Sequence, residues 1–390
     1  MNQGKYVFSQ IVDLVVRYQF NQCVIRYQGE HYVKSFSCWD QFLSLAFGQL
    51  SFRRSLRDII VCLTAHQKKL YHLGFRSKVC LPTLARANEQ RNWKIYRDFA
   101  LLLITEARTL YSKEYLKTLE IDEPIYILDA TIIKLCLSLF PWARIPKKLA
   151  AIKLQMVIEL HGNIPAFFTF SRGKVSDVSY LDQIEFEAGA YYVFDRGYYD
   201  FGRFYEINTA QAFFVTRAKT TWSWRRLYSK KVDKKTGICC DQIVVQGRHH
   251  HIKKYPAKMR RIKYYDSLTK RYYVFITNNF KLEATTIAEL YKQRWQVELF
   301  FKWIKQHLSV KVFWGRSENA VKTQICIAIS IYLLVAIFKK RAHIKRNSYE
   351  ILQIISVSLF DKIPITQLIS GANPQIIEDG GQKQAKLWVC

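Results

Sequence analysis

The chain has 390 residues, of which 60 are Lys or Arg and 31 are Asp or Glu, so its formal net charge is +29. Because 49% of the residues are hydrophobic and 15% are aromatic, this composition excludes a disordered basic tail and indicates a folded protein. The length allows two or three domains with buried cores, and the positive charge predicts a polyanionic partner, nucleic acid.

No segment is typical of export, membrane insertion or metal-stabilised folding. The N-terminus lacks an apolar signal segment, and the longest apolar run, residues 325–338, is too short to span a bilayer and predicts a core helix. The nine cysteines form no CxxC pair, so neither a disulfide framework nor a structural zinc site is indicated. We therefore expect a cytoplasmic protein that does not bind a membrane.

Residues 1–120 predict a helical domain. Apolar residues recur at helical spacing in three segments, 39–49, 56–73 and 96–116. Polar and basic side chains cluster at the predicted starts of helices in two segments, 51–57 (SFRRSLR) and 82–91 (PTLARANEQR), as in a DNA-contacting helix-turn-helix. Helical domains with basic surfaces are also common, so this pattern alone leaves open both DNA binding and a plain solvated surface.

The periodicity changes at about Pro124, where short apolar runs rich in β-branched and aromatic residues begin. Turn residues separate these runs, and a helical segment, 177–188, lies among them. The predicted strands are 125–133, 150–160, 164–171, 190–194, 211–217 and 272–278. This order of strands and helices is typical of an α/β fold.

A basic segment interrupts the α/β pattern. Residues 217–271 hold 17 Lys and Arg against three Asp, a net charge of +14. Aromatic residues, among them Trp222 and Trp224, are interleaved with these bases, a mixture that can follow phosphates while stacking on nucleic-acid bases. The segment predicts either a DNA-contacting insertion or a β-rich insertion with a solvated basic surface.

The segment 291–305, YKQRWQVELFFKWIK, predicts a largely buried helix with one charged stripe. At about 100° per residue, four side chains fall within an arc of roughly 60°: Tyr291, Arg294, Glu298 and Lys305. A charged stripe on a buried helix needs a partner, because burying unpaired charge is costly. The alternative is a solvated face that carries a simple i, i+7 ion pair.

Two aspartates are predicted at the carboxyl ends of hydrophobic strands, Asp129 after YIL and Asp195 after YYVF. An isolated acid in such a place is usually a cap or a turn former, but two in one α/β unit can face a shared crevice. With Glu298 they would supply three carboxylates, which suit Mg²⁺ or Mn²⁺. Two such ions can activate a nucleophile and stabilise the leaving oxygen in a displacement at phosphorus.

These residues resemble those of a known family. Asp129 in LDAT, Asp195 in FDRGYYD, and the pattern Tyr-x2-Arg-x3-Glu-x6-Lys from Tyr291 to Lys305 are similar to the DDE transposases of bacterial insertion sequences, in the group defined by that signature. The resemblance covers nearly the whole chain. It implies an RNase H-like catalytic core of α/β class, split by a β-rich insertion and preceded by an all-helical DNA-binding domain.

The roles of single residues follow from this resemblance. Asp129, Asp195 and Glu298 would be the catalytic triad and would bind two Mg²⁺ or Mn²⁺ ions. DNA contacts would come from Tyr291, Arg294, Lys305, Arg196, Trp222 and Trp224, with one of the tryptophans stacking on a flipped base. The implied activity is cut-and-paste transposition by 3′-end cleavage, hairpin formation and strand transfer. A homodimer would act on terminal inverted repeats and target DNA in the nucleoid.

The implied domain organisation has five parts. They are a DNA-binding domain (1–120), the first part of the core (121–218), the insertion (219–271), the second part of the core (272–345) and a C-terminal helical tail (346–390). Two other functions remain compatible with part of the pattern. An RNase H-like nuclease or resolvase explains the acids but not the long helical domain, and a catalytically silent DNA-binding regulator would not need all three acids.

Overall fold

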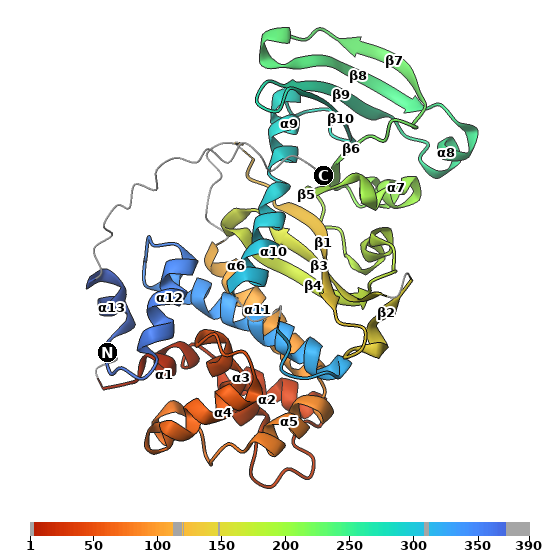
Figure 1. Cartoon of the computed structure of the whole chain (residues 1–390). Coiled ribbons are helices and arrows are strands. Elements are labelled where there is room, and N and C mark those ends of the chain that lie inside the picture. The colour runs from red at the N-terminus through yellow and green to blue at the C-terminus, as the bar shows by residue number, and fades with distance from the viewer. Residues whose placement is uncertain (1–3, 112–118, 120, 147–148, 308–311, 372–390) are drawn as a thin grey trace.

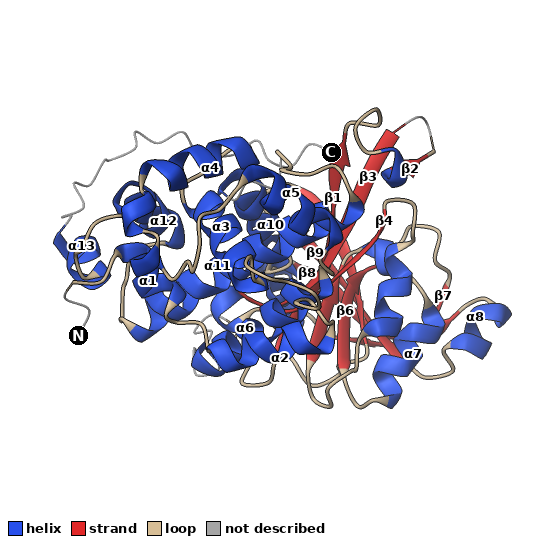
Figure 2. Cartoon of the chain, turned by 90° about the horizontal axis from the view of Figure 1, so that it is seen from below, coloured by secondary structure: helices blue, strands red, loops and turns tan. Residues whose placement is uncertain are grey.

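The computed structural model describes residues 4–111, 119, 121–146, 149–307 and 312–371. Figure 1 shows a helical body, a central sheet, and a group of strands at the end of the molecule far from the helical body. Seen from below in Figure 2, helices cover both faces of the sheet. The fold is therefore mixed α/β, with a helical region formed by the first part of the chain.

The strands of the described chain form one 10-stranded sheet. Along it the order is β2-β3-β1-β5-β6-β10-β9-β8-β7, and β4 also pairs with β3. β1 is parallel to β5, and β5 to β6, whereas the other pairs are antiparallel. The bounds are β1 (Ile125–Leu135), β2 (Arg144–Ile145), β3 (Leu149–Glu159), β4 (Ile164–Arg172), β5 (Tyr191–Phe194), β6 (Phe213–Arg217), β7 (Trp224–Lys230), β8 (Ile238–Gln246), β9 (Met259–Asp266) and β10 (Arg271–Thr277).

Local sequence explains where several helices begin. Ser37 and Asp40 form a capping box at the start of α3, Pro82 lies in the first turn of α5, and Ser317 caps α11. The helices are α1 (Val7–Val12), α2 (Arg17–Arg26), α3 (Cys38–Leu50), α4 (Leu56–Ala65), α5 (Leu81–Gln90), α6 (Lys94–Tyr111), α7 (Phe201–Thr209), α8 (His249–Lys254), α9 (Ala284–Lys292), α10 (Trp295–His307), α11 (Glu318–Arg341), α12 (Ser348–Ser358) and α13 (Ile365–Gly371).

Alternation along β1 divides its side chains between two cores, because successive residues of a strand point to opposite faces of the sheet. Ile125, Ile127 and Ile133 pack in one cluster with α6, α10 and α11. Tyr126 and Leu128 pack in the other cluster, with α7. Asp129 has the parity of Ile125 and Ile127, so it belongs to the face that α10 covers.

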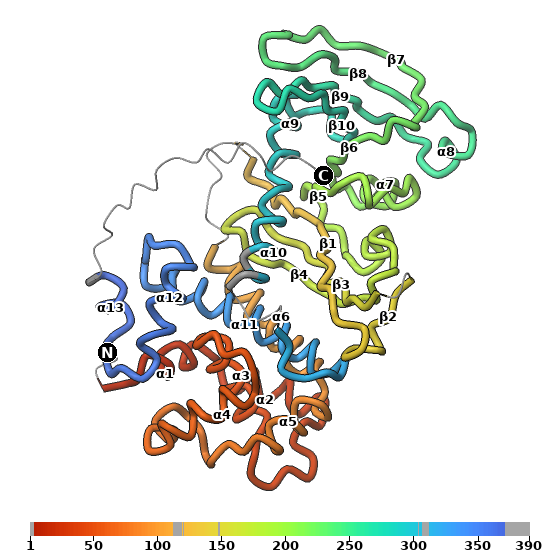
Figure 3. The backbone as a smooth tube through the Cα atoms, viewed as in Figure 1, coloured from red at the N-terminus to blue at the C-terminus, as the bar shows by residue number. Residues whose placement is uncertain are grey.

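The two ends of the described chain meet in the helical body, where the red and blue segments of Figure 3 lie together. The amide of Val7 donates to the carbonyl of Asp361 (3.0 Å), and the side chain of Gln10 donates to the carbonyl of Ile363 (2.8 Å). The predicted C-terminal tail is thus packed, as far as residue 371, against the first helix. Its remaining part, 372–390, lies outside the described residues.

The apolar run at 325–338 is the centre of α11. Among the described helices, only α11 is long and apolar enough to cross a membrane, and 83% of its most apolar window is buried inside the protein. It contacts α3, α5 and α6, so the prediction of a core helix is confirmed. α6, which α11 contacts, packs in turn on β4, so these two helices join the helical body to the sheet.

Two predicted helices are shorter than expected. The segment 56–73 is helical only to Ala65 and continues as two 3₁₀ turns, which bring Leu70 and Leu73 into the core. The segment 177–188 is a 3₁₀ helix, Asp177–Gln183, followed by extended chain. Ile184 and Phe186 both pack on the α7 side of the sheet, and only extended backbone places residues i and i+2 on one side. The predicted helix at 96–116 is described as far as Tyr111, because residues 112–118 lie outside the described residues.

The basic segment is rich in strands, as predicted, and these strands extend the main sheet. β7, β8 and β9 follow one another as antiparallel neighbours, and β9 pairs with β10, which pairs in turn with β6. The whole segment is therefore joined through β10 to the strands beside Asp195. β7 is the edge strand, and its side chains are mostly exposed.

Candidate active site

Asp129 and Asp195 lie side by side because β1 and β5 are parallel and in register. Leu128 pairs with Phe194, and Phe194 pairs with Thr216 of β6. The residues that follow these pairs are Asp129 on β1, Asp195 directly after β5 and Arg217 on β6. Two residues more than 60 positions apart in the chain thus become neighbours on the face of the sheet that α10 covers.

The prediction that Asp129 ends its strand is wrong. β1 continues for six residues to Leu135, since it stays paired with β3 through Leu135↔Ala150. β5 does end at Phe194, so Asp195 follows a strand end as predicted. Asp195 also starts a turn, where its Oδ1 accepts a hydrogen bond from the Gly197 amide (2.6 Å). β1 therefore extends past the end of β5, and Asp129 faces the space beyond β5.

The predicted helix 291–305 crosses this row of residues but is interrupted. α9 ends at Lys292 and α10 begins at Trp295, and the amide of Arg294 donates to the carbonyl of Tyr291 (3.1 Å), a tighter spacing than an α-helix. The ring of Tyr291 packs on Phe275, with centroids 4.9 Å apart. Arg294 lies in the interruption, above Asp129.

Arg294 links two of the predicted catalytic carboxylates. Its Nη1 donates to Asp129 Oδ2 at 3.2 Å, and its Nη2 donates to Glu298 Oε1. A simple ion pair on a solvated face of the helix would need no partner on the sheet. Here the contact reaches a strand 165 residues earlier in the chain, so the stripe of α10 has a partner on the sheet.

Lys305, the last residue of the predicted stripe, contacts the same strand two and three residues after Asp129. Its Nζ donates to Thr131 Oγ1 and to the carbonyl of Ile132 (3.4 Å). An open cavity of about 450 Å³ lies between β1 and α10. It is lined by Asp129, Ala130, Thr131, Glu298, Phe301, Lys302 and Lys305.

The stripe helix is less buried than predicted. Val297, Phe300 and Ile304 are buried, whereas Leu299 is 41% exposed. Trp295 is 44% exposed. One side of α10 therefore packs on the sheet and on α11, and the other side remains open to a further partner.

Burial sets the protonation of the site. Burial, helped by the neighbouring Asp195 and Glu298, raises the pKa of Asp129 to about 7, although Arg294 and the amide of Ala130 lower it. Burial also raises the pKa of Tyr291 to about 12. Burial lowers the pKa of Arg294, but Tyr291, Asp129 and Glu298 outweigh it and raise this pKa above its ordinary value. Arg294 stays charged, while Asp129 is poised between its two states near neutral pH.

The carboxylates suit a hard divalent cation by their chemistry, since Mg²⁺ and Mn²⁺ take oxygen ligands. In the part of the chain that the structure describes, no three His, Cys, Asp or Glu side chains are close enough together to hold one ion. The guanidinium of Arg294 is itself a cation held by Asp129 and Glu298. The carboxylates of Asp129 and Glu298 can therefore reach a common positive centre, and their oxygen donors fit a divalent cation.

The other predicted DNA contacts differ in exposure. Arg196 is exposed and directly follows Asp195. Trp222 is only 8% exposed and packs against Tyr199, with centroids 4.7 Å apart. Trp224 lies at the start of edge strand β7 and is half-buried. Of the two tryptophans, Trp224 is the one whose ring solvent reaches.

Three residues near the site were not predicted from the sequence. Arg217 follows the last registered pair of β5 and β6, and it helps to set the pKa of Tyr291. Thr131 accepts from Lys305, and Lys302 lines the cavity. The sequence held a signal for Arg217, because it directly follows the apolar run FFVT in the same way that Asp195 directly follows YYVF. Lys302 lies four residues after Glu298, on the same side of α10.

Comparisons with known proteins identify the family of the chain. Residues 120–334 match the family described as Transposase DDE domain, and residues 3–76 match a domain of unknown function, DUF4372. The chain is 31% identical over 247 residues to the putative transposase y4zB of Sinorhizobium fredii, which covers 62% of this chain and 68% of the relative. It is 27% identical over 259 residues to the probable transposase for insertion sequence element IS5377 of Geobacillus stearothermophilus, which covers 65% of this chain and 66% of the relative.

Among solved structures, the piggyBac transposase in its synaptic complex with hairpin DNA aligns over 94% of this chain and 80% of that one. The identity is 9% and the TM-score is 0.46, which is too low to show a shared fold. The family match extends over more than half of the residues and includes Asp129, Asp195 and Glu298. The resemblance to insertion-sequence transposases is confirmed, and this chain belongs to the transposase DDE domain family.

Proposed function

We propose that this chain catalyses the cut-and-paste transposition of an insertion sequence, with Asp129, Asp195 and Glu298 as its catalytic triad. The observation that carries the proposal is the position of Asp129, which the strand register places beside Asp195 and which lines one cavity together with Glu298. Two of the acids come from neighbouring parallel strands, and the third is tied to Asp129 through Arg294. Membership of the family supports DNA transposition as the activity.

The strand order supports an RNase H-like core. In the order β4-β3-β1-β5-β6 the first three strands are antiparallel neighbours, and β5 and β6 are added parallel to β1. In this proposal the core spans 121–218 and 272–345, and residues 219–271 are the insertion between them. Residues 1–120 are the DNA-binding domain, and 346–390 are the C-terminal tail.

Asp129, Asp195 and Glu298 would hold two Mg²⁺ or Mn²⁺ ions. When bound, these ions supply activation of a water or a 3′ hydroxyl and stabilisation of the oxygen that leaves phosphorus. Arg294 would exchange its carboxylate partners for a phosphate of the bound DNA, since a guanidinium binds phosphate in the same two-donor manner. Tyr291, Lys305 and the exposed Arg196 would hold neighbouring phosphates.

The proposed substrates are the terminal inverted repeats of the element and a target duplex. 3′-end cleavage, a hairpin intermediate and strand transfer would follow one another at the same triad, within a homodimer that holds two ends together. A base flipped from the cleaved end would stack on Trp224 rather than on Trp222, because the ring of Trp222 is buried. Such a protein acts where the chromosome lies, in the nucleoid of the cytoplasm.

The test is a matched pair of glutamate substitutions on neighbouring helices. Glu298→Ala should abolish Mg²⁺-dependent cleavage and joining of end duplexes while their binding is retained. Glu289→Ala is the control, because Glu289 is half-buried on α9 and pairs with Lys292 alone among the charged residues described. Cleavage that persists in Glu298→Ala would remove this residue from the triad. Binding without cleavage by the native chain in either metal would indicate the silent regulator.

A further inference from the structure

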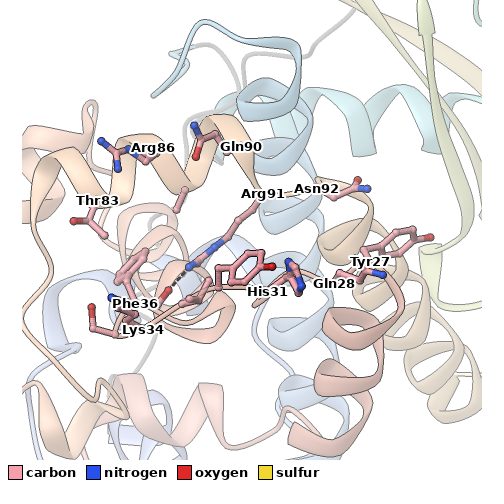
Figure 4. Close-up of a pocket in the computed structure, with 15 residues that line it drawn as sticks. Tyr27, Gln28, His31, Lys34, Phe36, Thr83, Arg86, Gln90, Arg91 and Asn92 are labelled. Carbon is pink, nitrogen blue, oxygen red and sulfur yellow. Dashed lines mark hydrogen bonds between the residues drawn. The ribbon is translucent and has the colours of Figure 1, made fainter.

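A cavity of about 560 Å³ lies in the helical body, outside the sheet and its carboxylates. Its walls are the face of α5 and the loop that joins α2 to α3 (Figure 4). The loop belongs to the segment that matches the domain of unknown function. Volumes of this size are typical of ligand sites, and this one is open to solvent along α5.

The lining of this cavity is cationic. It contains no Asp or Glu, whereas His31, Lys34 and Arg86 are exposed around it. Arg91, directly after α5, reaches across the cavity toward the loop and donates to the carbonyls of Phe36 and Ser37 (Figure 4). These acceptors are neutral, so the charge of Arg91 adds to the positive potential of the cavity.

The face of α5 presents side chains that have no other task in the structure. Thr83, Arg86 and Gln90 are spaced at i, i+3 and i+7, which places them along one side of the helix. All three are exposed, and in the described part of the chain none makes a side-chain hydrogen bond or an ion pair. Arg and Gln are the residue types that read guanine and adenine edges in a major groove with two hydrogen bonds.

The loop adds an aromatic side chain in an unusual conformation. Tyr32 is 91% exposed, and its backbone has a φ of +60°, a region that bulky residues rarely adopt. Its ring contacts that of His31, with centroids 3.9 Å apart. A strained and solvated aromatic residue at the rim of a cationic cavity suits contact with the sugar or base of a nucleic acid.

We propose that this cavity is a DNA-reading site, in which α5 enters the major groove of the terminal repeat and the loop 27–36 holds its backbone. Arg86 and Gln90 contact base edges and thereby select the sequence. Lys34 and Tyr32 contact the backbone and contribute to affinity for any duplex. The proposal rests on the proposed function and gives its helical domain a specific reading surface.

The test uses the full-length chain and labelled duplexes of about 40 base pairs from each flank of the coding region, compared with scrambled duplexes of equal composition. Arg86→Ala and Gln90→Ala should each lower the preference for the flank duplex over the scrambled one by about 5- to 100-fold. Lys34→Ala should leave this preference unchanged and reduce the slope of log affinity against log salt by about one. Fluorescence anisotropy over a salt series measures both quantities.

Two control variants match these changes outside the cavity. Lys68→Ala and Gln67→Ala remove the same kinds of group from an exposed 3₁₀ turn that does not line it. Equal preference in the native chain, Arg86→Ala and Gln90→Ala would overturn the proposal. An equal loss in the control variants would also do so, since it would indicate a general charge effect.

A cleavage assay separates this inference from the proposed function. On supercoiled DNA without flank sequences, the native chain and the cavity variants should nick equally in Mn²⁺. If the native chain prefers the flank duplex and nicks DNA but the cavity variants prefer it equally, only the cavity assignment fails. If the native chain neither prefers that duplex nor nicks DNA, the proposed function fails as well.

Discussion

At the scale of single residues, Arg294 organises the candidate site. It is the one described cation with direct contacts to both Asp129 and Glu298, and it lies in the interruption between α9 and α10. Glu298 lies four residues after Arg294 in the chain, whereas Asp129 comes from β1, 165 residues earlier. A charge-assisted contact of this kind is about twice as strong as a neutral hydrogen bond, so a cation that enters the site must compete with it.

Removal of Arg294 should therefore strengthen metal binding when no DNA is present. We expect Arg294→Ala to bind Mn²⁺ about 10-fold more tightly than the native chain in titration calorimetry, and Arg294→Lys to lie between them. Lys292→Ala is the control, because Lys292 contacts only Glu289 among the described carboxylates. Unchanged or weaker binding in Arg294→Ala would show that the guanidinium does not hold the metal position.

The raised pKa of Asp129, about 7, should make the metal-free protein less stable as pH rises. Its carboxyl ionises near pH 4 in the unfolded chain but only near pH 7 in the folded one, so the free energy of unfolding falls across this window. The side chain of Asp129→Asn cannot ionise, so this variant keeps its free energy of unfolding as pH rises. It should be more stable than the native chain by about 1–3 kcal/mol at pH 8, and by much less at pH 4. Urea titrations in EDTA at both pH values measure the difference.

Asp182→Asn provides a control of opposite sign for this pH experiment. A hydrogen bond from Arg203 lowers the pKa of Asp182, so the stability that it contributes is present above pH 4 and is lost as pH falls. Parallel pH curves for the native chain and Asp129→Asn would contradict the assignment of a raised pKa to Asp129.

At the scale of elements, the position of α9 and α10 depends on the strands of the basic segment. Arg260 of β9 is buried, forms two hydrogen bonds of 2.8 Å with Asp241 of β8, and donates to the carbonyls of Asn279 and Leu282. These carbonyls belong to the turn that leads into α9. A side chain of the basic segment thus holds the start of the helix that carries Tyr291.

Arg260→Met should be strongly destabilising, because it leaves Asp241 buried without its ion pair. We expect a loss of about 3–5 kcal/mol in the free energy of unfolding. The double variant Arg260→Met/Asp241→Leu should recover most of this loss, since two apolar side chains can replace a buried ion pair. Chemical denaturation of the three proteins checks this, and a double variant no more stable than Arg260→Met would contradict it.

At the scale of the whole molecule, the first and last described helices form one body. The apolar surface of α11 is buried within this body against α3, α5 and α6, and α6 contacts β4 of the sheet. The predicted DNA-binding domain and C-terminal tail are therefore parts of one packed unit as far as residue 371. A dimer contact through α11 would require this unit to open.

Removal of residues 346–390 should prevent the helical body from folding. The truncation deletes six buried apolar side chains, Ile351, Leu352, Ile355, Leu359, Ile365 and Ile369. At about 1.5–3 kcal/mol each, their loss is comparable with a total stability of about 5–15 kcal/mol. Removal of 372–390 is the control, since it keeps every described contact. Thermal melts followed by circular dichroism compare the two, and a native-like melt of the shorter chain would contradict the prediction.

Much of this protein could be predicted from local patterns. Strands and helices were placed because periodicity and turn residues act over a few positions, and the spacing from Tyr291 to Lys305 indicated the family directly. The boundaries were less accurate where tertiary contacts compete with propensity, as at 177–188, where Ile184 and Phe186 pack on the sheet in extended chain. Propensity alone does not contain that packing.

Composition and spacing established a basic α/β protein with three candidate acids, because charge and periodicity are properties of neighbouring residues. Only the folded chain decided that Asp129 and Asp195 share one row, that Arg294 joins Asp129 to Glu298, and that Trp222 is buried. Each of these depends on strand register or on packing between segments far apart in the chain. A shift of one residue in the pairing of β1 with β5 would turn an aspartate to the opposite face, and no local pattern specifies that register.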